Sequence, residues 1–189
     1  MCTECPRRLA ADLDAAFPEF LAHHQELVYG IALRSTRRPA DAEDLAQEAF
    51  IRAYRALREY PPERTRGLRP NGWLAAIVGN LGRNRARRKT PATADLAAVA
   101  EIRADDGPGP DRLAERRETA AAWRARLAAL PARYRRAVEL RHASGLSYPE
   151  LAEALGRPLG TVKSDVHRGV QLLRKAYEDE MNDDSHEVA

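Results

Sequence analysis

Several features of membrane, secreted and disulfide-stabilised proteins are missing from this sequence. No apolar run approaches the roughly 18 residues that a membrane-spanning helix needs. The first residues, MCTECPRRLAADLD, lack the apolar core of a signal peptide. Only two cysteines are present, Cys2 and Cys5, so no disulfide framework holds the fold. We therefore expect a cytoplasmic protein.

Strand patterns and catalytic constellations are also missing. Nearly every periodic segment has helical spacing, and no alternating apolar pattern stands out. The sequence shows no nucleophile beside a base, no phosphate-cradling glycine loop and no cluster spaced like metal ligands. We expect an all-α protein that is not an enzyme and that needs no cofactor and no metal.

The charge of the chain is unevenly distributed. Its net charge is +3, but residues 178–189 carry many acids and no Lys or Arg. The rest of the chain is therefore more basic than the total suggests, which suits a polyanionic partner. The acidic end is expected to be a disordered tail.

The composition changes in the middle of the chain. Proline, glycine and acidic residues concentrate between Thr90 and Thr119, as in a flexible linker. A first helix is expected over about 10–35, where Pro18 could divide it. We expect two small helical domains joined by this linker. The boundaries are 10–90, 91–118 (the linker), 119–177 and 178–189 (the tail).

The stretch LSYPELAEALGRPLGTVKSDVHRGVQLLRK, from Leu146 to Lys175, has the pattern of a helix-turn-helix. Ser147 and Glu150 form a capping box at the start of the first helix. Gly156 can take the left-handed conformation that ends it. The inward positions of the second helix are predicted to be Val162, Val166, Val170 and Leu173. The pattern fits DNA binding, and it also fits an ordinary helical hairpin with a solvated face.

The segment DAEDLAQEAFIRAYRAL, from Asp41 to Leu57, has two distinct faces. Its apolar face consists of Leu45, Ala46, Ala49, Phe50, Ala53, Tyr54 and Leu57. Glu48 and Arg52 on the other face have the spacing of an i,i+4 ion pair. The exposed Ile51 on that face favours a protein-binding surface, although spacing alone also allows a solvated one.

Three stretches together resemble an extracytoplasmic-function sigma factor, a small bacterial sigma factor. They are DAEDLAQEAFIRAYRAL, WLAAIVGNLGRNRARR and the sequence LPARYRRAVELRHASGLSYPELAEALGRPLGTVKSDVHRGVQLLRK. They occur in the family's order and spacing. The resemblance implies an alternative sigma factor that binds core RNA polymerase and directs promoter-specific transcription initiation. The implied partners are core RNA polymerase and promoter DNA, and an anti-sigma factor is a candidate third partner whose existence the sequence does not reveal.

The resemblance also assigns roles to residues. The helix containing DLAQE would dock on the clamp helices of the polymerase, and its contacts would be Asp44, Gln47, Glu48, Ile51 and Arg52. The helix from Asn71 to Arg88 would bind the −10 element, with its predicted inner face formed by Leu74, Ile77, Val78 and Leu81. Its DNA contacts would be Asn80, Arg83, Asn84, Arg87 and Arg88, with Arg85 as a further phosphate contact. The Tyr60–Asn71 loop would form a pocket for an unstacked base, which Asn80 could line.

The second helix of the helix-turn-helix would read the −35 element by resemblance. Its DNA contacts would be Lys163, Ser164, His167 and Arg168. Asp165 stands where relatives often carry Arg. An acid there would either repel phosphate or accept a hydrogen bond from a cytosine amino group.

Other interpretations compete with this one. A self-standing helix-turn-helix regulator would need neither the DLAQE helix nor the Asn71–Lys89 segment, and a sigma-like protein-interaction module is a third class. The acidic linker could mimic RNA in the exit channel or act as a spacer. The pair Cys2 and Cys5 could hold a metal, act as a redox pair or have no function.

Overall fold

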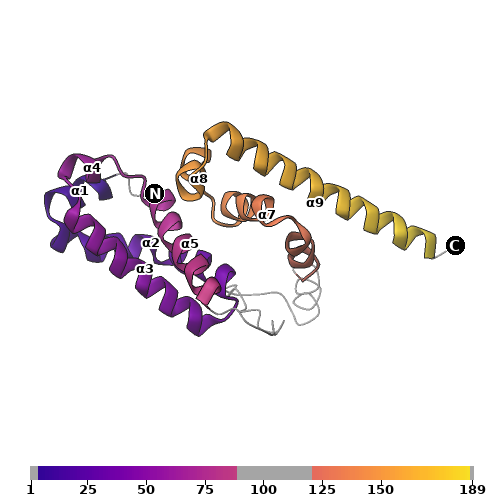
Figure 1. The fold of residues 1–189 in the computed structure, drawn as a ribbon, viewed down its shortest axis with the longest axis horizontal. Helices are drawn as coiled ribbons and strands as arrows, with labels where there is room; N and C mark the ends of the chain where they lie inside the picture. Colours follow the sequence, from indigo (N-terminus) through magenta and orange to yellow (C-terminus); the bar gives the residue numbers. More distant parts are fainter. Residues whose placement is uncertain (1–3, 89–120, 188–189) are drawn as a thin grey trace, which may run out of the picture. The chain divides into compact units, whose positions relative to one another are not determined.

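The structure, a computed structural model, describes residues 4–88 and 121–187, and every regular element in these ranges is a helix (Figure 1). The expectation of an all-α fold is confirmed. The described residues form two units, one with residues 4–88 and 146–157 and the other with 121–145 and 158–187. The predicted linker, 91–118, lies outside the described residues. No described helix is long and apolar enough to cross a membrane.

The first two helices are separated at Asp12. α1 spans Cys5–Ala11 and α2 spans Leu13–Thr36. Asp12 has extended backbone angles, and its side chain accepts a hydrogen bond from the N–H of Ala15 at 3.0 Å. Pro18 lies inside α2 and does not divide it. The break that the sequence suggests near Pro18 therefore occurs at a capping residue instead.

Three long helices form the core of the first unit. α3 spans Pro39–Glu59 and α5 spans Pro70–Arg88, and both pack against α2 and against each other. A short helix, α4, spans Pro62–Arg66 within the segment predicted as a loop. α8, Tyr148–Leu155, also groups with this unit. The largest fully buried apolar side chains of this unit are Phe20, Val28, Leu45, Leu74, Val78, Leu146 and Leu151.

The second unit is built around α9, which spans Leu159–Glu187. Residues 121–129 are helical, and α7 spans Ala132–Val138. α7 continues into a π-helical turn, η1, over Glu139–Ala143. Leu130 and Val138 form a buried cluster with Leu173 of α9, and Leu127 packs against it. This cluster holds α9 against the preceding helices.

The acidic end of the chain is not disordered where the structure describes it. α9 continues through Glu187, although the sequence predicts a disordered tail from residue 178. Arg126 Nε donates to Glu180 at 2.9 Å, and Trp123 stacks on Tyr177 with ring centroids 6.1 Å apart. These contacts with the helical residues 121–129 stabilise the start of the acidic segment, which periodicity alone does not reveal.

Candidate polymerase and nucleic-acid interfaces

α3 presents one buried and one exposed face. Ala42, Leu45, Ala49, Phe50, Ala53 and Leu57 are buried. Ala46 and Tyr54, which were predicted on the apolar face, are half-buried at its edge. The opposite side carries all the predicted polymerase contacts: Asp44, Gln47, Ile51 and Arg52 are exposed and Glu48 is half-buried. The structure thus brings these five side chains together on one helix face.

An apolar groove of about 780 Å³ lies between α2 and α3. Phe17, Leu21 and Tyr29 of α2 form one wall. Gln47 and Ile51 belong to the other wall, and Ile51 is 52% exposed. Sequence reasoning missed the α2 wall. Its only signal was the i,i+4 spacing of Phe17 and Leu21, on a side of α2 adjacent to its buried stripe.

Glu48 connects α3 to α5. Its Oε1 accepts from Arg52 Nη2 at 2.9 Å, which confirms the predicted ion pair, and its Oε2 accepts from Arg85 Nη2 at 3.0 Å. Burial acts to raise the pKa of Glu48, but the bonds from Arg85 and Arg52 outweigh it and the pKa is lowered. Arg85 also donates to the carbonyl of Asp41 at 3.4 Å. Arg85, expected to hold phosphate, is instead engaged by α3.

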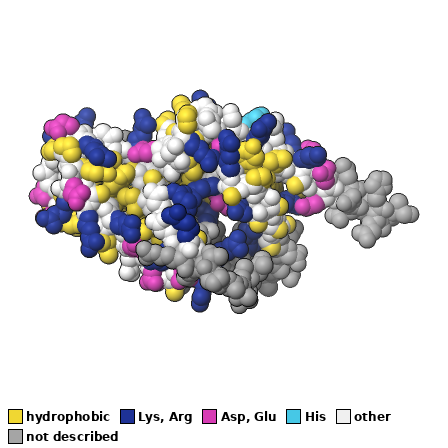
Figure 2. Space-filling view, in the orientation of Figure 1, with side chains coloured by type: hydrophobic (Ala, Val, Ile, Leu, Met, Phe, Trp, Pro, Cys, Tyr) yellow, Lys and Arg dark blue, Asp and Glu magenta, His cyan; other side chains and the backbone are white. Residues whose placement is uncertain are grey.

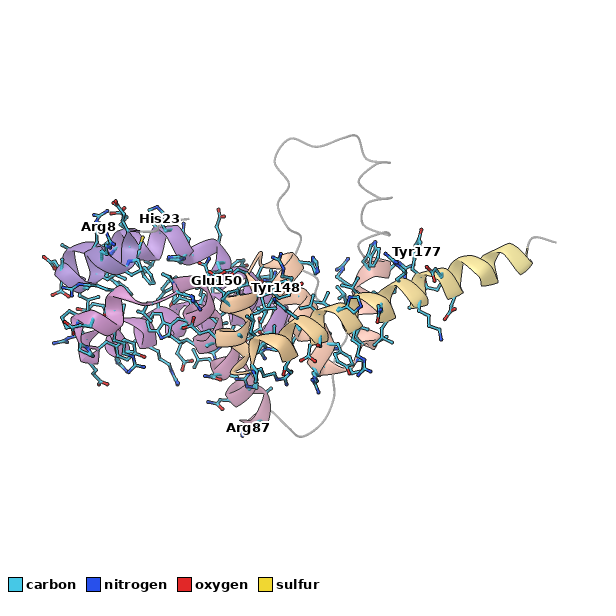
Figure 3. All side chains as sticks on the ribbon, turned by 90° about the horizontal axis from the view of Figure 1, so that it is seen from above. Arg8, His23, Arg87, Tyr148, Glu150 and Tyr177 are labelled. Carbon is cyan, nitrogen blue, oxygen red and sulfur yellow. The ribbon has the colours of Figure 1, made fainter. Side chains whose placement is uncertain are left out.

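α5 buries Leu74, Val78 and Leu81 as predicted, while Ile77 is half-buried. Its other face exposes two pairs of amide and guanidinium groups. Arg83 donates to the Oδ1 of Asn80, and Arg87 donates to the Oδ1 of Asn84 at 2.7 Å. Figure 3 shows Arg87 at the exposed end of α5. These four predicted DNA contacts therefore lie on one face, and Arg88 is the last residue of the helix.

The segment after α3 is held by an aromatic cluster. The Tyr60 ring lies 6.1 Å from that of Trp73, and the Arg64 guanidinium lies 3.7 Å above Tyr60. A cavity of about 300 Å³ in contact with this segment is lined by residues of α1, α2, α3 and α4. They include Leu9, Asp12, Tyr60, Pro62 and Thr65, and they do not include Asn80. The structure therefore does not place Asn80 in the cavity that the Tyr60–Asn71 segment forms.

The helix-turn-helix segment has the predicted local structure. The Glu150 carboxylate accepts from the Ser147 N–H at 2.8 Å in the capping box. Gly156 takes the left-handed conformation with φ 61° and ends α8, and α9 begins at Leu159. The four predicted contacts are all exposed along α9: Lys163, Ser164, His167 and Arg168. Basic side chains are also visible on the surfaces of both units in Figure 2.

One predicted inward position of α9 is wrong. Val162, Val166 and Leu173 are buried, but Val170 is 38% exposed. Gly169 takes the inner position because α9 approaches α7 closely there. A Cβ atom at Gly169 would lie 2.5 Å from Cγ2 of Val138. The absence of a side chain at Gly169 thus permits the close helix contact.

Asp165 does not face outward. It is 1% exposed, and its Oδ1 accepts from Arg133 Nε at 2.8 Å and pairs with Nη2 at 2.7 Å. This bonding raises the pKa of Arg133. The two alternatives drawn from sequence, repulsion of phosphate and acceptance from cytosine, are both wrong for this position because the carboxylate is turned toward α7.

The cysteine pair is only partly described. Cys5 is buried at the start of α1, while Cys2 lies outside the described residues. Among the described residues, no group of three or more His, Cys, Asp or Glu side chains could hold a metal ion. His23 and His24, the histidines nearest to the cysteine pair in the sequence, both lie on α2.

Sequence comparisons match both parts of the chain. Residues 20–91 match the family described as Sigma-70 region 2, and residues 120–173 match Sigma-70, region 4. The ECF RNA polymerase sigma factor SigW of Bacillus subtilis is 32% identical over 173 residues, covering 87% of this chain and 90% of SigW. SigE of Mycolicibacterium smegmatis is 38% identical over 167 residues, covering 85% of this chain, which spans 62% of SigE.

Solved structures share the fold. CnrH, solved in complex with the cytosolic domain of CnrY, superposes with a TM-score of 0.66 at 22% identity, covering 94% of this chain and 97% of CnrH. RpoE of Bartonella quintana, solved in complex with the anti-sigma factor NepR, superposes with a TM-score of 0.63 at 23% identity. The match covers 86% of this chain and 96% of RpoE.

The two matched families and the all-helical described units, which expose polar faces on α3, α5 and α9, identify a protein of transcription. The chain belongs to the ECF family of RNA polymerase sigma factors. It is an alternative sigma factor, and it directs transcription initiation.

Proposed function

We propose that this sigma factor binds core RNA polymerase through the exposed face of α3 and promoter DNA through α5 and α9. One observation carries the polymerase-binding part: Ile51, a large apolar side chain, is 52% exposed at the edge of the apolar groove between α2 and α3. Exposed apolar surface bordered by polar groups is typical of a protein-binding site. Ile51 forms the apolar part of this contact, the Gln47 amide offers hydrogen bonds beside it, and Asp44, Glu48 and Arg52 form its charged edge.

α5 is proposed to bind the −10 element. Its contacts are Asn80, Arg83, Asn84, Arg87 and Arg88. The amide and guanidinium groups of the two described pairs offer donors and acceptors to bases, and the guanidinium groups can also neutralise phosphates. Arg85 is left out of this set because its guanidinium is bonded to Glu48 and Asp41.

α9 is proposed to read the −35 element in the major groove through Lys163, Ser164, His167 and Arg168. In this proposal the domain of residues 10–90 binds polymerase and the −10 element, and the domain of residues 119–177 binds the −35 element.

An anti-sigma factor is a further candidate partner, because Bartonella quintana RpoE, which shares the fold, was solved in complex with one. In this proposal the protein acts in the cytoplasm, and the polymerase carries out the chemistry.

The polymerase-binding surface can be tested by titrating labelled core polymerase with the full-length protein. The double variant Gln47→Ala, Ile51→Ser removes an amide and an exposed apolar side chain without touching the ion pairs of Glu48. We expect its affinity for core polymerase to fall at least about tenfold, which corresponds to ~1.4 kcal/mol. Glu59→Ala, at the exposed C-terminal end of α3, is the matched control and should bind like the wild type.

Thermal unfolding of both variants shows whether the fold is intact. A folded Gln47→Ala, Ile51→Ser variant that binds core polymerase as tightly as the Glu59→Ala control would remove this face of α3 from the polymerase interface.

A further inference from the structure

Arg133 of α7 and Asp165 of α9 form an ion pair behind the predicted DNA-reading face. Asp165 is 1% exposed, whereas the Arg133 side chain is 52% exposed. Two guanidinium nitrogens, Nε at 2.8 Å and Nη2 at 2.7 Å, meet the same carboxylate oxygen, Oδ1. Charge-assisted hydrogen bonds from two donors of one guanidinium are strong, and they restrict the orientation of the guanidinium relative to the carboxylate.

The pair lies within the stretch of α9 that carries the predicted DNA contacts. Ser164 directly precedes Asp165, and His167 follows two residues later, yet both of these are exposed while Asp165 is buried. Gly169, one helical turn after Asp165, lies on the same side of α9 and meets Val138 of α7. Two successive turns of α9 therefore contact α7, one through an ion pair and one through close packing.

Rotation of α9 about its axis would break this arrangement. Neighbouring side chains on a helix are about 100° apart around its axis, so a rotation of that order would replace each outward-facing side chain by its neighbour. It would also separate Asp165 from Arg133 and leave a buried carboxylate without its partner, which is strongly unfavourable. A larger rotation would turn the carboxylate toward DNA phosphates, which repel it. The ion pair therefore favours one rotational setting of α9.

We infer that Arg133 and Asp165 are positioning residues for upstream promoter recognition. They touch no DNA. They fix the rotation of α9 so that Lys163, His167 and Arg168 are presented together. This inference rests on the proposed function, in which these exposed residues of α9 read the −35 element.

The test uses the holoenzyme, reconstituted from the full-length protein and core RNA polymerase, and a promoter library randomised in the −35 element. Asp165→Asn keeps the size of the side chain and removes its charge, and Arg133→Gln removes the partner. Each is expected to reduce the preference for the best −35 sequence over the library average by at least about tenfold, at several positions together. Because the two residues act as one unit, the double variant should lose no more than the stronger single variant.

Two control variants separate positioning from other effects. Arg168→Ala tests direct reading and should relax preference at one position. Leu173→Ala weakens the core of the second unit without touching the ion pair, and thermal unfolding of all variants provides the comparison. A merely structural role of Arg133 and Asp165 would lower the folded fraction, as Leu173→Ala does, and would leave the sequence preference of the folded protein unchanged.

The outcomes are distinguishable. If Arg168→Ala alters the preference but Asp165→Asn and Arg133→Gln do not, the inference is wrong and the proposed function stands. The inference is also wrong, and the proposed function stands, if Asp165→Asn and Arg133→Gln lose sequence preference only in proportion to their loss of stability, as Leu173→Ala does. If Lys163→Ala and Arg168→Ala also leave the preference unchanged, α9 does not read the element and both proposals fail.

Discussion

His24 in α2 is a buried histidine whose Nε2 has no hydrogen-bond partner in the described part of the chain. Its side chain is 6% exposed, and its ring centroid lies 4.6 Å from that of Phe20. Burial lowers the pKa of His24, and the neighbouring His23 lowers it further, whereas a hydrogen bond with the Asn71 side chain acts in the opposite direction. The neutral form of His24 is therefore the one that the folded state favours.

This lowered pKa makes stability depend on pH. Because the folded-state pKa is below the ordinary value of 6.5, the unfolded chain binds the proton more readily as the pH falls. The contribution to stability is fully present above about pH 6.5 and declines as the pH falls below it. We expect the melting temperature to decrease between about pH 7.5 and about pH 5.5 by more in the wild type than in His24→Leu.

The comparison of the two proteins cancels the effect of the other histidines and of the carboxylates. Equal decreases in melting temperature would mean that His24 does not titrate differently in the folded and unfolded states.

Local signals at single residues were predicted well from sequence, and long-range pairings were not. The capping box of Ser147 and Glu150, the left-handed Gly156 and the ion pair of Glu48 with Arg52 depend on residues three to four apart or on one residue's own conformation. The pairs of Arg85 with Glu48 and of Arg133 with Asp165 join residues 37 and 32 positions apart. No periodic pattern encodes such a pairing, so neither the bonds from Arg85 to α3 nor the burial of Asp165 was predicted.

The contact between α7 and α9 depends on the missing side chain at Gly169. Alanine is favoured over glycine in a helix by about 1 kcal/mol. At Gly169 this gain is opposed by a methyl group 2.5 Å from Cγ2 of Val138, and overpacking costs about 1–3 kcal/mol. We expect Gly169→Ala to lower the free energy of unfolding in urea by roughly 1 kcal/mol.

Gly160 provides the matched control in the same helix. A Cβ atom there would meet nothing within 4 Å, so Gly160→Ala should be neutral or stabilising by up to about 1 kcal/mol. Adding Val138→Ala to Gly169→Ala should cost less than the two separate changes together, because it removes the clashing methyl group. A Gly169→Ala protein as stable as Gly160→Ala would show that α7 and α9 do not meet closely.

At the scale of elements, apolar periodicity predicted the helices and their inner faces, including those of α3 and α5. It did not predict the α4 helix, the continuity of α2 through Pro18 or the length of α9. These features depend on contacts with other elements, such as that of Arg126 with Glu180, which stabilises the acidic end of α9. The exposure of Val170 has the same origin, since the close approach of α7 at Gly169 determines which side of α9 faces inward.

At the scale of the whole molecule, the sequence motifs predicted the family, and the comparisons confirm it. The structure adds what the motifs did not contain. The apolar groove between α2 and α3 extends the proposed polymerase surface beyond α3, and the cavity at the Tyr60–Asn71 segment is separate from Asn80. Both features arise from packing between helices that are distant in sequence.

The central claim is that this chain gives core RNA polymerase its promoter specificity. It is tested most directly by run-off transcription with core polymerase, with and without the protein, on a library of promoter-length templates, with duplex binding by the free protein measured in parallel. We predict defined transcript starts only when both components are present, and weak binding of duplex DNA by the free protein. Unchanged transcript starts, together with tight sequence-specific binding of duplex DNA by the free protein, would contradict the claim.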